Sequence, residues 1–372
     1  MSSVGGARVL VIGRSPEVLE TVLDELSGVG LRAQGTTDPE RADEHFDAGE
    51  FDLIAFGGGV AAATAERLQR AFRQRNPGVR LLRTFAPRAV REIVTALDDT
   101  IPPPEVDVDA YLARIGHTGS RVPTLDTLRA LHRRHPDAIV FEAIDVLLDK
   151  GVDLAPQAVD AKLIHAGRGG YCFEHNTLLW RVLTELGFTV EGLVGRVRWR
   201  AAPGNPPTPP THMALRVTLD GVPWLVDVGF GGCVLTAPLR MDTSAPQQTD
   251  HESFRVIPFG NQWLVQIRID GRWQSMYELE AGPWLVSDYE VPNWYTSTHP
   301  SSNFRQRLMV ARTSERVRYT LLGNRLTVRP NDAPAERHLL DADGLERTLR
   351  GTFGLDVQPE WRPLLEQEAA QA

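Results

Sequence analysis

Cysteine is scarce in this sequence, which has only Cys172 and Cys233 among its 372 residues. A pair so sparse does not form the dense disulfide framework of small secreted proteins. The chain also lacks an uncharged apolar run long enough to span a bilayer. The short apolar stretch near its amino terminus is better explained as a buried strand than as a signal peptide. These absences predict that the protein is not exported and does not cross a membrane, and a reducing cytoplasm fits it best.

An excess of positive charge is missing as well. The formal net charge is -8, which removes the electrostatic attraction that a general nucleic-acid binder needs. A local basic pocket for one anionic ligand is still compatible with this charge. Internal repeats and low-complexity tracts are also missing. The 42% hydrophobic content is that of an ordinary globular protein, and 372 residues predict two or three cores rather than one.

The first hundred residues alternate short apolar runs with amphipathic helical patterns. We expect strands at residues 8–13, 52–56 and 79–83, and helices at residues 17–26 and 63–75. Continuous apolar strands separated by helices indicate a parallel sheet that is covered on both faces. The sequence therefore predicts a small doubly wound α/β domain over residues 1–101.

Gly13-Arg14 lies at the end of the first of these predicted strands, Gly57 follows the next, and Thr84 follows the last. This pattern resembles a response-regulator receiver in which the acidic pair and the phosphoacceptor aspartate have been replaced, while the threonine is kept. The glycine run 57–59 lacks the spacing of a phosphate-binding fingerprint. The resemblance implies a degenerate receiver-like (flavodoxin-like) module that is not phosphorylated and serves as a scaffold or an interaction surface.

The sequence Ile-Pro-Pro-Pro at residues 101–104 breaks the α/β pattern. Successive prolines stiffen the backbone and cannot continue a helix, so we expect a domain boundary there. Beyond it, helical spacing dominates from residue 107 to about 162, and strands dominate from about 189 to 276. The tail mixes strands such as residues 325–328 with a helix near residues 342–350.

The segment RGGYCFEHN, at residues 168–176, is the most informative part of the chain. Apolar residues at helical spacing follow it, which puts Cys172 at or near a helix start. The positive end of the peptide dipoles favours a thiolate at such a position, as a nucleophile requires. Most free cysteines are buried packing residues, however, so a catalytic interpretation needs a base close to Cys172.

A hairpin supplies a candidate base. Residues 211–219 and 222–228 have strand patterns, and Asp220-Gly221 between them is a favoured two-residue turn. If residues 219 and 222 pair, His212 and Asp227 lie on one face as diagonal neighbours, within reach of each other. An imidazole that accepts the thiol proton and a carboxylate that orients it complete a cysteine nucleophile. The alternative is a hydrogen-bonded strand histidine and an aspartate that merely ends a strand.

A glycine-rich turn, Gly229-Phe230-Gly231-Gly232, comes shortly after Asp227. Such turns can cradle a pyrophosphate through backbone N–H groups, although a simple tight turn explains the glycines equally well.

The motifs RGGYCFEHN, THMALRV and WLVDVGFGG together resemble the arylamine N-acetyltransferase family, in which Cys, His and Asp in this chain order form a catalytic triad. Further matches are YLARI at residues 111–115, FE at 141–142, NWYTSTHPSSNF at 293–304, LGNRLT at 322–327 and FGL at 353–355. The likeness covers roughly residues 105–361. It implies a papain-like acetyltransferase fold with a helical bundle at 105–188, a β-barrel at 189–290 and an α/β lid at 291–372.

The resemblance also implies a reaction. Acetyl-coenzyme A acylates Cys172, and an arylamine or hydrazine then takes the acetyl group in a ping-pong mechanism that uses His212 and Asp227. Residues that match the turn holding coenzyme A are Gly229, Phe230 and Gly231. Residues that match the aromatic lining of the acceptor pocket are Phe141 and Phe230. Ala143 replaces an asparagine that many members have, and Pro136 interrupts the preceding helix, so we expect a reshaped acceptor pocket.

Three alternatives stay open on the sequence. The same triad serves an amide synthase that releases a carrier-bound polyketide, and it could equally hydrolyse an amide or a peptide. Both domains could also be non-catalytic binding scaffolds. A metal site is not expected, because His132 and His135 have no cysteine or carboxylate set at ligand spacing. These two histidines are interpreted as ordinary surface residues.

Overall fold

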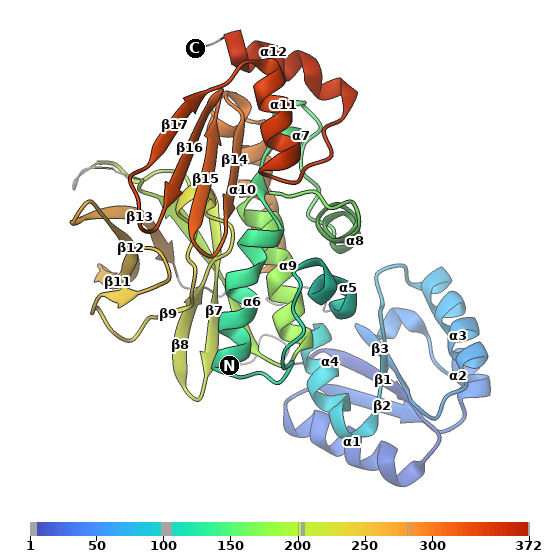
Figure 1. The fold of residues 1–372 in the computed structure, drawn as a ribbon. Coiled ribbons are helices and arrows are strands. Elements are labelled where there is room, and N and C mark those ends of the chain that lie inside the picture. The colour runs from blue at the N-terminus through green and yellow to red at the C-terminus, as the bar shows by residue number, and fades with distance from the viewer. Residues whose placement is uncertain are drawn as a thin grey trace. The chain divides into compact units, whose positions relative to one another are not determined.

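The computed structural model describes residues 6–97, 106–199, 201, 205–280, 282 and 284–370. The chain divides into two compact units, Met1–Ile101 and Pro102–Ala372 (Figure 1). This division coincides with the boundary expected at the proline run, although the prolines themselves lie outside the described residues. Among the described residues, no helix is both long and apolar enough to cross a membrane.

The first unit contains a four-stranded parallel sheet in the order β2-β1-β3-β4. Its strands are β1 (Arg8–Ile12), β2 (Arg32–Thr36), β3 (Leu53–Gly57) and β4 (Arg80–Thr84), and its helices are α1 (Pro16–Gly28), α2 (Ala42–His45), α3 (Ala62–Arg75) and α4 (Ala89–Leu97). Val9 and Val11 pack with α1 and α4, whereas Leu10 and Ile12 pack with α2 and α3. Helices therefore cover both faces, as the continuous apolar strands predicted.

Strand β2 was absent from the predicted strands. Its sequence, RAQGT, carries no apolar run, and none of its residues is fully buried, so hydrophobic periodicity gave no signal for it. Its pairing with β1 along five residues places it at the edge of the sheet. At the end of β4, the Thr84 hydroxyl is buried and donates a hydrogen bond to the Glu92 carboxylate.

The second unit begins with helices that build one apolar core. They are α5 (Val108–Arg114), α6 (Leu125–Ala138), α7 (Ile144–Leu147), α8 (Pro156–Asp160), a π-helical turn at Ala161–His165 and α9 (Cys172–Glu185). Pro136 does not interrupt α6, contrary to expectation, because the helix continues for one more half-turn to Ala138. Since a proline has no N–H, the carbonyl of His132, four residues earlier, receives no helical hydrogen bond from it.

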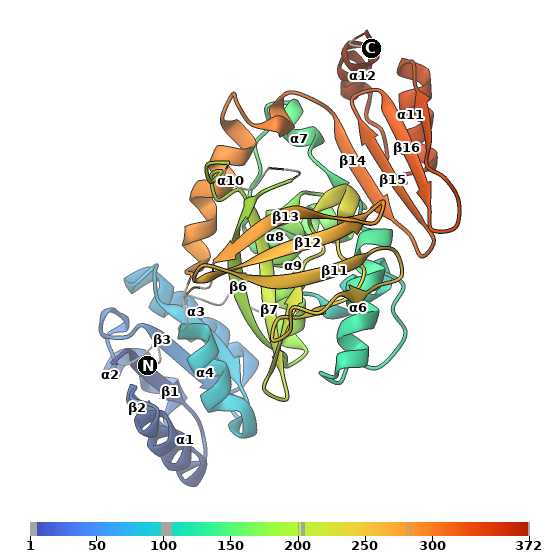
Figure 2. The same cartoon turned by 90° about the vertical axis from the view of Figure 1, so that its left-hand side faces the viewer.

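An eight-stranded sheet follows, in the order β10-β11-β12-β13-β6-β7-β8-β9. Its strands are β6 (Thr189–Val197), β7 (His212–Leu219), β8 (Val222–Val226), β9 (Leu239–Arg240), β10 (Gln247–Gln248), β11 (Ser253–Phe259), β12 (Gln262–Ile269) and β13 (Arg272–Glu280). Strands β11 and β9, near opposite ends of this order, are in contact. The sheet therefore curls toward a barrel around its own core, with β11 to β13 crossing in front of β6 and β7 in Figure 2.

The last part is a five-stranded antiparallel sheet in the order β17-β16-β15-β14-β5. Its elements are β14 (Met309–Thr313), β15 (Val317–Leu322), β16 (Arg325–Pro330), β17 (Glu336–Leu339), α11 (Ala342–Gly351) and α12 (Arg362–Ala370), preceded by α10 (Glu290–Thr298). Helices α11 and α12 pack on the sheet through apolar residues such as Leu345 and Leu365 (Figure 1). Strand β5 (Phe141–Glu142) comes from the region predicted as a helical bundle, so that prediction was wrong at these two residues.

Candidate active site

Helix α9 begins at Cys172, as the sequence predicted. The side chain of Glu174 folds back on the helix start, where its Oε2 accepts a hydrogen bond from the N–H of Tyr171 at 2.9 Å. This side-chain cap satisfies a backbone donor at the helix start. Cys172 is 3% exposed, and its Sγ lies 3.6 Å from the carbonyl oxygen of Thr211, the residue before β7. The thiol therefore faces the strand that carries the predicted base.

A cluster of charged side chains anchors the segment in front of Cys172. Lys162 Nζ lies 2.8 Å from carboxylate oxygens of both Asp145 and Glu174. Arg168 lies 2.7 Å from Glu142 and 3.2 Å from Asp145. Two cations thus face three carboxylates, and Glu142 and Glu174 are nearly fully buried. Because a buried charge without a partner is costly, this cluster fixes the backbone that enters α9.

The hairpin has the predicted register, with residues 219 and 222 paired and the Asp220-Gly221 turn in the left-handed region. His212 Nε2 and Asp227 Oδ2 are 2.8 Å apart, and the two residues are 2% and 0% exposed. Burial lowers the pKa of His212, but the charge and hydrogen bond of Asp227, with further contributions from Cys172, raise it to about 10. Burial opposes ionisation of Asp227, yet His212 and other hydrogen bonds hold its pKa below the usual range. The imidazole is therefore an imidazolium at neutral pH, with a carboxylate on one side and Cys172 on the other.

Asn176 links the helix of Cys172 to the hairpin, a role that was not predicted from the sequence. Its Nδ2 donates to Met213 O at 2.7 Å and to Asp227 Oδ1 at 3.1 Å. Its Oδ1 accepts from the N–H of Val228 at 3.2 Å. A signal was available, because residue 176 lies one helical turn after Cys172 and so shares its face of the helix. Asn176 therefore joins the nucleophile and its acid–base partners into one rigid unit.

The glycine-rich turn packs directly against the helix start. A Cβ on Gly229 would lie 2.6 Å from Cys172 Cα and 2.9 Å from Asn176 Nδ2, and the N–H of Gly229 donates to Asp227 Oδ1 at 2.9 Å. Gly231 has a φ of 73°, and a side chain there would contact the ring of Phe141. Phe230 stacks edge-on against the His212 ring, with centroids 5.2 Å apart. The turn thus brings Phe230 to the imidazole and Gly231 to Phe141.

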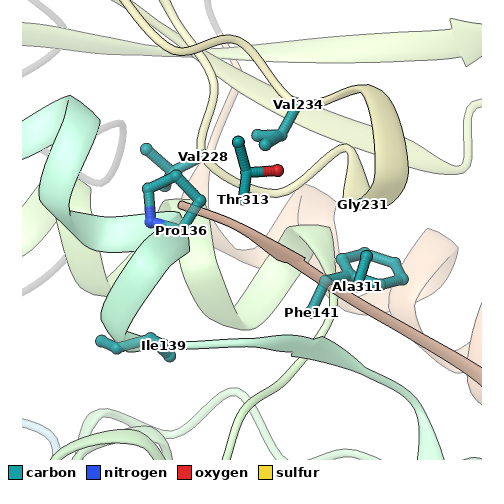
Figure 3. A pocket seen from close by; sticks show the side chains of 8 residues that line it. All are labelled: Pro136, Ile139, Phe141, Val228, Gly231, Val234, Ala311 and Thr313. Carbon is teal, nitrogen blue, oxygen red and sulfur yellow. The ribbon is translucent and has the colours of Figure 1, made fainter. Parts of the chain in front are cut away.

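Phe141 lines a narrow crevice in the second unit (Figure 3). The crevice lies between the end of α6, the glycine-rich turn and β14. Its lining residues are Pro136, Ile139, Phe141, Val228, Gly231, Val234, Ala311 and Thr313. The ring of Phe141 also contacts Phe304, with centroids 6.0 Å apart. Nearly all of the lining side chains are apolar, and the space between them does not admit even a water molecule, so the crevice is a packed apolar seam in this structure.

His132 and His135 are not surface residues, contrary to the sequence interpretation, because both are fully buried. His135 bridges the hydroxyl of Tyr111 at 2.9 Å and Nδ1 of His175 at 2.8 Å. Nε2 of His175 lies 3.0 Å from the carbonyl oxygen of Gly170. Burial is the main cause that holds the pKa of His135 well below its usual value. Helical periodicity alone did not show that partners from α5 and α9 would cover this face of α6.

Within the described residues, no group of three or more His, Cys, Asp or Glu side chains could hold a metal ion.

Comparison with known proteins gives a consistent set of matches. The protein-family model described as N-acetyltransferase matches residues 124–362, inside the second unit. The arylamine N-acetyltransferase of Mycobacterium tuberculosis is 41% identical over 255 residues, which cover 68% of this chain and 90% of that protein. The Escherichia coli K12 protein of the same name is 40% identical, with 66% and 88% covered. The structure of Mycobacterium marinum arylamine N-acetyltransferase in complex with CoA aligns with a TM-score of 0.67 at 41% identity, covering 71% of this chain and 99% of that one.

Proposed function

Because the chain belongs to the arylamine N-acetyltransferase family, we propose that it transfers an acetyl group from acetyl-coenzyme A to an arylamine or hydrazine through a thioester on Cys172. The observation that carries this proposal is the arrangement of the three residues. Cys172 starts a buried helix and faces the strand of His212, and Asp227 binds the far nitrogen of that imidazole at 2.8 Å. A thiol, an acid–base group and an orienting carboxylate are the parts that acyl transfer through cysteine requires.

In the first half-reaction, Cys172 Sγ attacks the thioester carbonyl of acetyl-coenzyme A. The bond from carbon to the sulfur of coenzyme A breaks, and that sulfur leaves as a thiol with the proton from His212. In the second half-reaction, the amine attacks the Cys172 thioester and gives a proton to His212, and Sγ departs as thiolate. Asp227 keeps the imidazole oriented and stabilises its protonated form. The backbone N–H of Cys172, at the first position of α9, is a suitable donor to the oxyanion that forms in each step.

The proposed contacts with coenzyme A come from the glycine-rich turn, at Gly229, Phe230 and Gly231. The N–H of Gly229 is already bound to Asp227, so direct contact falls mainly to the other two residues. Phe141 and Phe230 are proposed to contact the arylamine, because the glycine-rich turn brings Phe230 against the His212 ring and Gly231 beside the ring of Phe141. An arylamine suits such a site because it is uncharged, and hence nucleophilic, at neutral pH.

For the first unit we propose a receiver-like module without phosphoryl chemistry. Its parallel strand order β2-β1-β3-β4 and its two covered faces support this assignment. Gly57 ends β3 where a receiver has its phosphoacceptor. We also propose a reducing compartment such as the cytoplasm for the protein, because the thiol of Cys172 must stay free to react, and both cysteines are free in the structure.

Intact-protein mass spectrometry tests the function directly. After the full chain is mixed with acetyl-coenzyme A, we expect one acetyl adduct, located on Cys172 by peptide mapping and removed by an added arylamine. Cys172→Ala should form no adduct. Cys233→Ala is the matched control, because it removes the second buried cysteine and leaves the triad intact, and it should be acetylated normally. A wild-type protein that never forms the adduct, or that forms it only from carrier-bound acyl donors, would refute the proposal, and the second outcome would favour an amide synthase.

A further inference from the structure

Three consecutive backbone N–H groups that begin at Asp227 are bound by side chains rather than by a neighbouring strand. The β7–β8 ladder ends one residue earlier. The N–H of Asp227 donates to His132 Nε2 at 3.2 Å, that of Val228 to Asn176 Oδ1 at 3.2 Å, and that of Gly229 to Asp227 Oδ1 at 2.9 Å. Helices α6 and α9, and not the sheet, therefore determine the path of the backbone at Asp227.

The protonation state of His132 follows from this contact. Its Nε2 accepts a hydrogen bond, so its proton is on Nδ1, and within the described residues this buried Nδ1 has no hydrogen-bond partner. Burial lowers the pKa of His132 to about 4, although the charge of Asp227 acts in the opposite direction. A buried donor without a partner destabilises the folded protein. An apolar side chain of similar size would fill the same space without this cost, so packing alone does not account for a histidine.

We propose that His132 is a positioning residue for acyl transfer, which acts by holding the main chain of Asp227 so that its carboxylate meets His212. The contact links residues 95 positions apart in the chain. Without it, the N–H of Asp227 is buried with no acceptor, and the backbone rotates to find one. Such a rotation would move Oδ2 away from its 2.8 Å contact with His212 Nε2. The catalytic consequence rests on the proposed function, whereas the geometric consequence does not.

Three substitutions separate this role from packing. In His132→Gln, the side-chain oxygen can reach the position of Nε2, so the acceptor is restored. In His132→Asn, the same amide is one carbon shorter and does not reach. His132→Met keeps a similar volume and has no strong acceptor. The matched control is His135→Met, one turn further along α6, which removes an equally buried imidazole that contacts Tyr111 and His175 and not the triad.

Two readouts are needed on the full chain. The first is the single-turnover rate of Cys172 acetylation at saturating acetyl-coenzyme A. We expect a rate close to that of wild type for H132Q and H135M, and a loss of about tenfold or more for H132N and H132M. The second is the downfield proton resonance of the imidazole N–H between His212 and Asp227, recorded by NMR without substrate. We expect it to shift in H132N and H132M and to stay in place in H132Q and H135M.

The outcomes are distinct. If H132N and H132M keep both the resonance and the rate, or if H132Q loses them as H132M does, His132 has no positioning role. If H132M does not fold, the comparison of H132N with H132Q decides in the same way. If wild type forms no acetyl adduct, the proposed function fails, but the NMR comparison still tests the role of His132.

Discussion

Substitution of Gly229 by alanine tests how closely the glycine-rich turn must approach the nucleophile. The φ of Gly229 is not positive, so alanine is allowed by its backbone and only contacts oppose it. The new Cβ would lie 2.6 Å from Cys172 Cα, whereas unstrained carbon atoms lie about 3.5–4.0 Å apart. The turn or the helix start must therefore move by roughly 1 Å.

The expected cost of this movement has two parts. Overpacking of a buried site lowers the free energy of unfolding by about 1–3 kcal/mol. A displacement of about 1 Å at the reacting group lowers the rate about 100-fold. We therefore expect the G229A variant to be less stable in urea denaturation. We also expect it to be slow both in acetylation by acetyl-coenzyme A and in alkylation of Cys172 by iodoacetamide.

Gly351→Ala is the matched control, because Gly351 ends α11 in the same unit and a Cβ there meets no atom within 4 Å. This variant should react like wild type and be at least as stable. If Gly229 served only to contact coenzyme A, G229A would raise the KM for acetyl-coenzyme A and leave alkylation unchanged. That result would refute the steric argument, and so would a G229A variant whose acetylation rate and stability both equal those of the wild type.

Two further predictions concern the buried carboxylate and imidazole. The pKa of His212 is raised to about 10 in the folded protein. The protonated imidazole therefore stabilises the fold fully below the ordinary histidine pKa of 6.5, and this stabilisation is lost as the pH rises through 10. Between pH 8 and 9.5, the free energy of unfolding of the wild type should fall as the pH rises. Its slope should be steeper than that of His212→Gln by about 1.4 kcal/mol per pH unit. Urea titrations at several pH values measure this, and equal slopes would contradict the assignment. In Asn176→Asp, a second carboxylate replaces the donor that lies 3.1 Å from Asp227 Oδ1, and like charges so close cannot both ionise. We expect a loss of stability on the order of 3 kcal/mol at pH 7 that recovers partly at pH 5. The control, Asn176→Ala, should not regain stability at pH 5. If both variants change in stability equally between pH 7 and pH 5, charge repulsion is excluded as the cause.

The local features of the site could be predicted from the sequence because short-range chemistry decides them. Asp220 and Gly221 adopt the positive φ values of a tight hairpin turn, and this turn fixes the register that puts His212 and Asp227 on one face. The apolar spacing after Cys172 likewise fixes the start of α9. In the first unit, the apolar runs of β1 and β3 were sufficient for a parallel sheet, although the polar edge strand β2 was missed.

The surroundings of these features were decided only by tertiary structure. His132 and His135 were predicted to be surface residues because a helical sequence pattern does not show which faces of the helix other elements cover. In the structure, α5, α9 and the hairpin bury both residues. Strand β5 pairs with β14, more than 160 residues later, and no local pattern selects that partner. Asn176 binds the N–H of Val228, two residues beyond the end of β8, only because the packing of the sheet against α9 brings this segment to the helix. Side-chain spacing along a chain determines turns, helix starts and register. Burial and partners between distant segments depend on how those elements pack, since each buried polar group must find its hydrogen bond in whatever segment the fold brings to it.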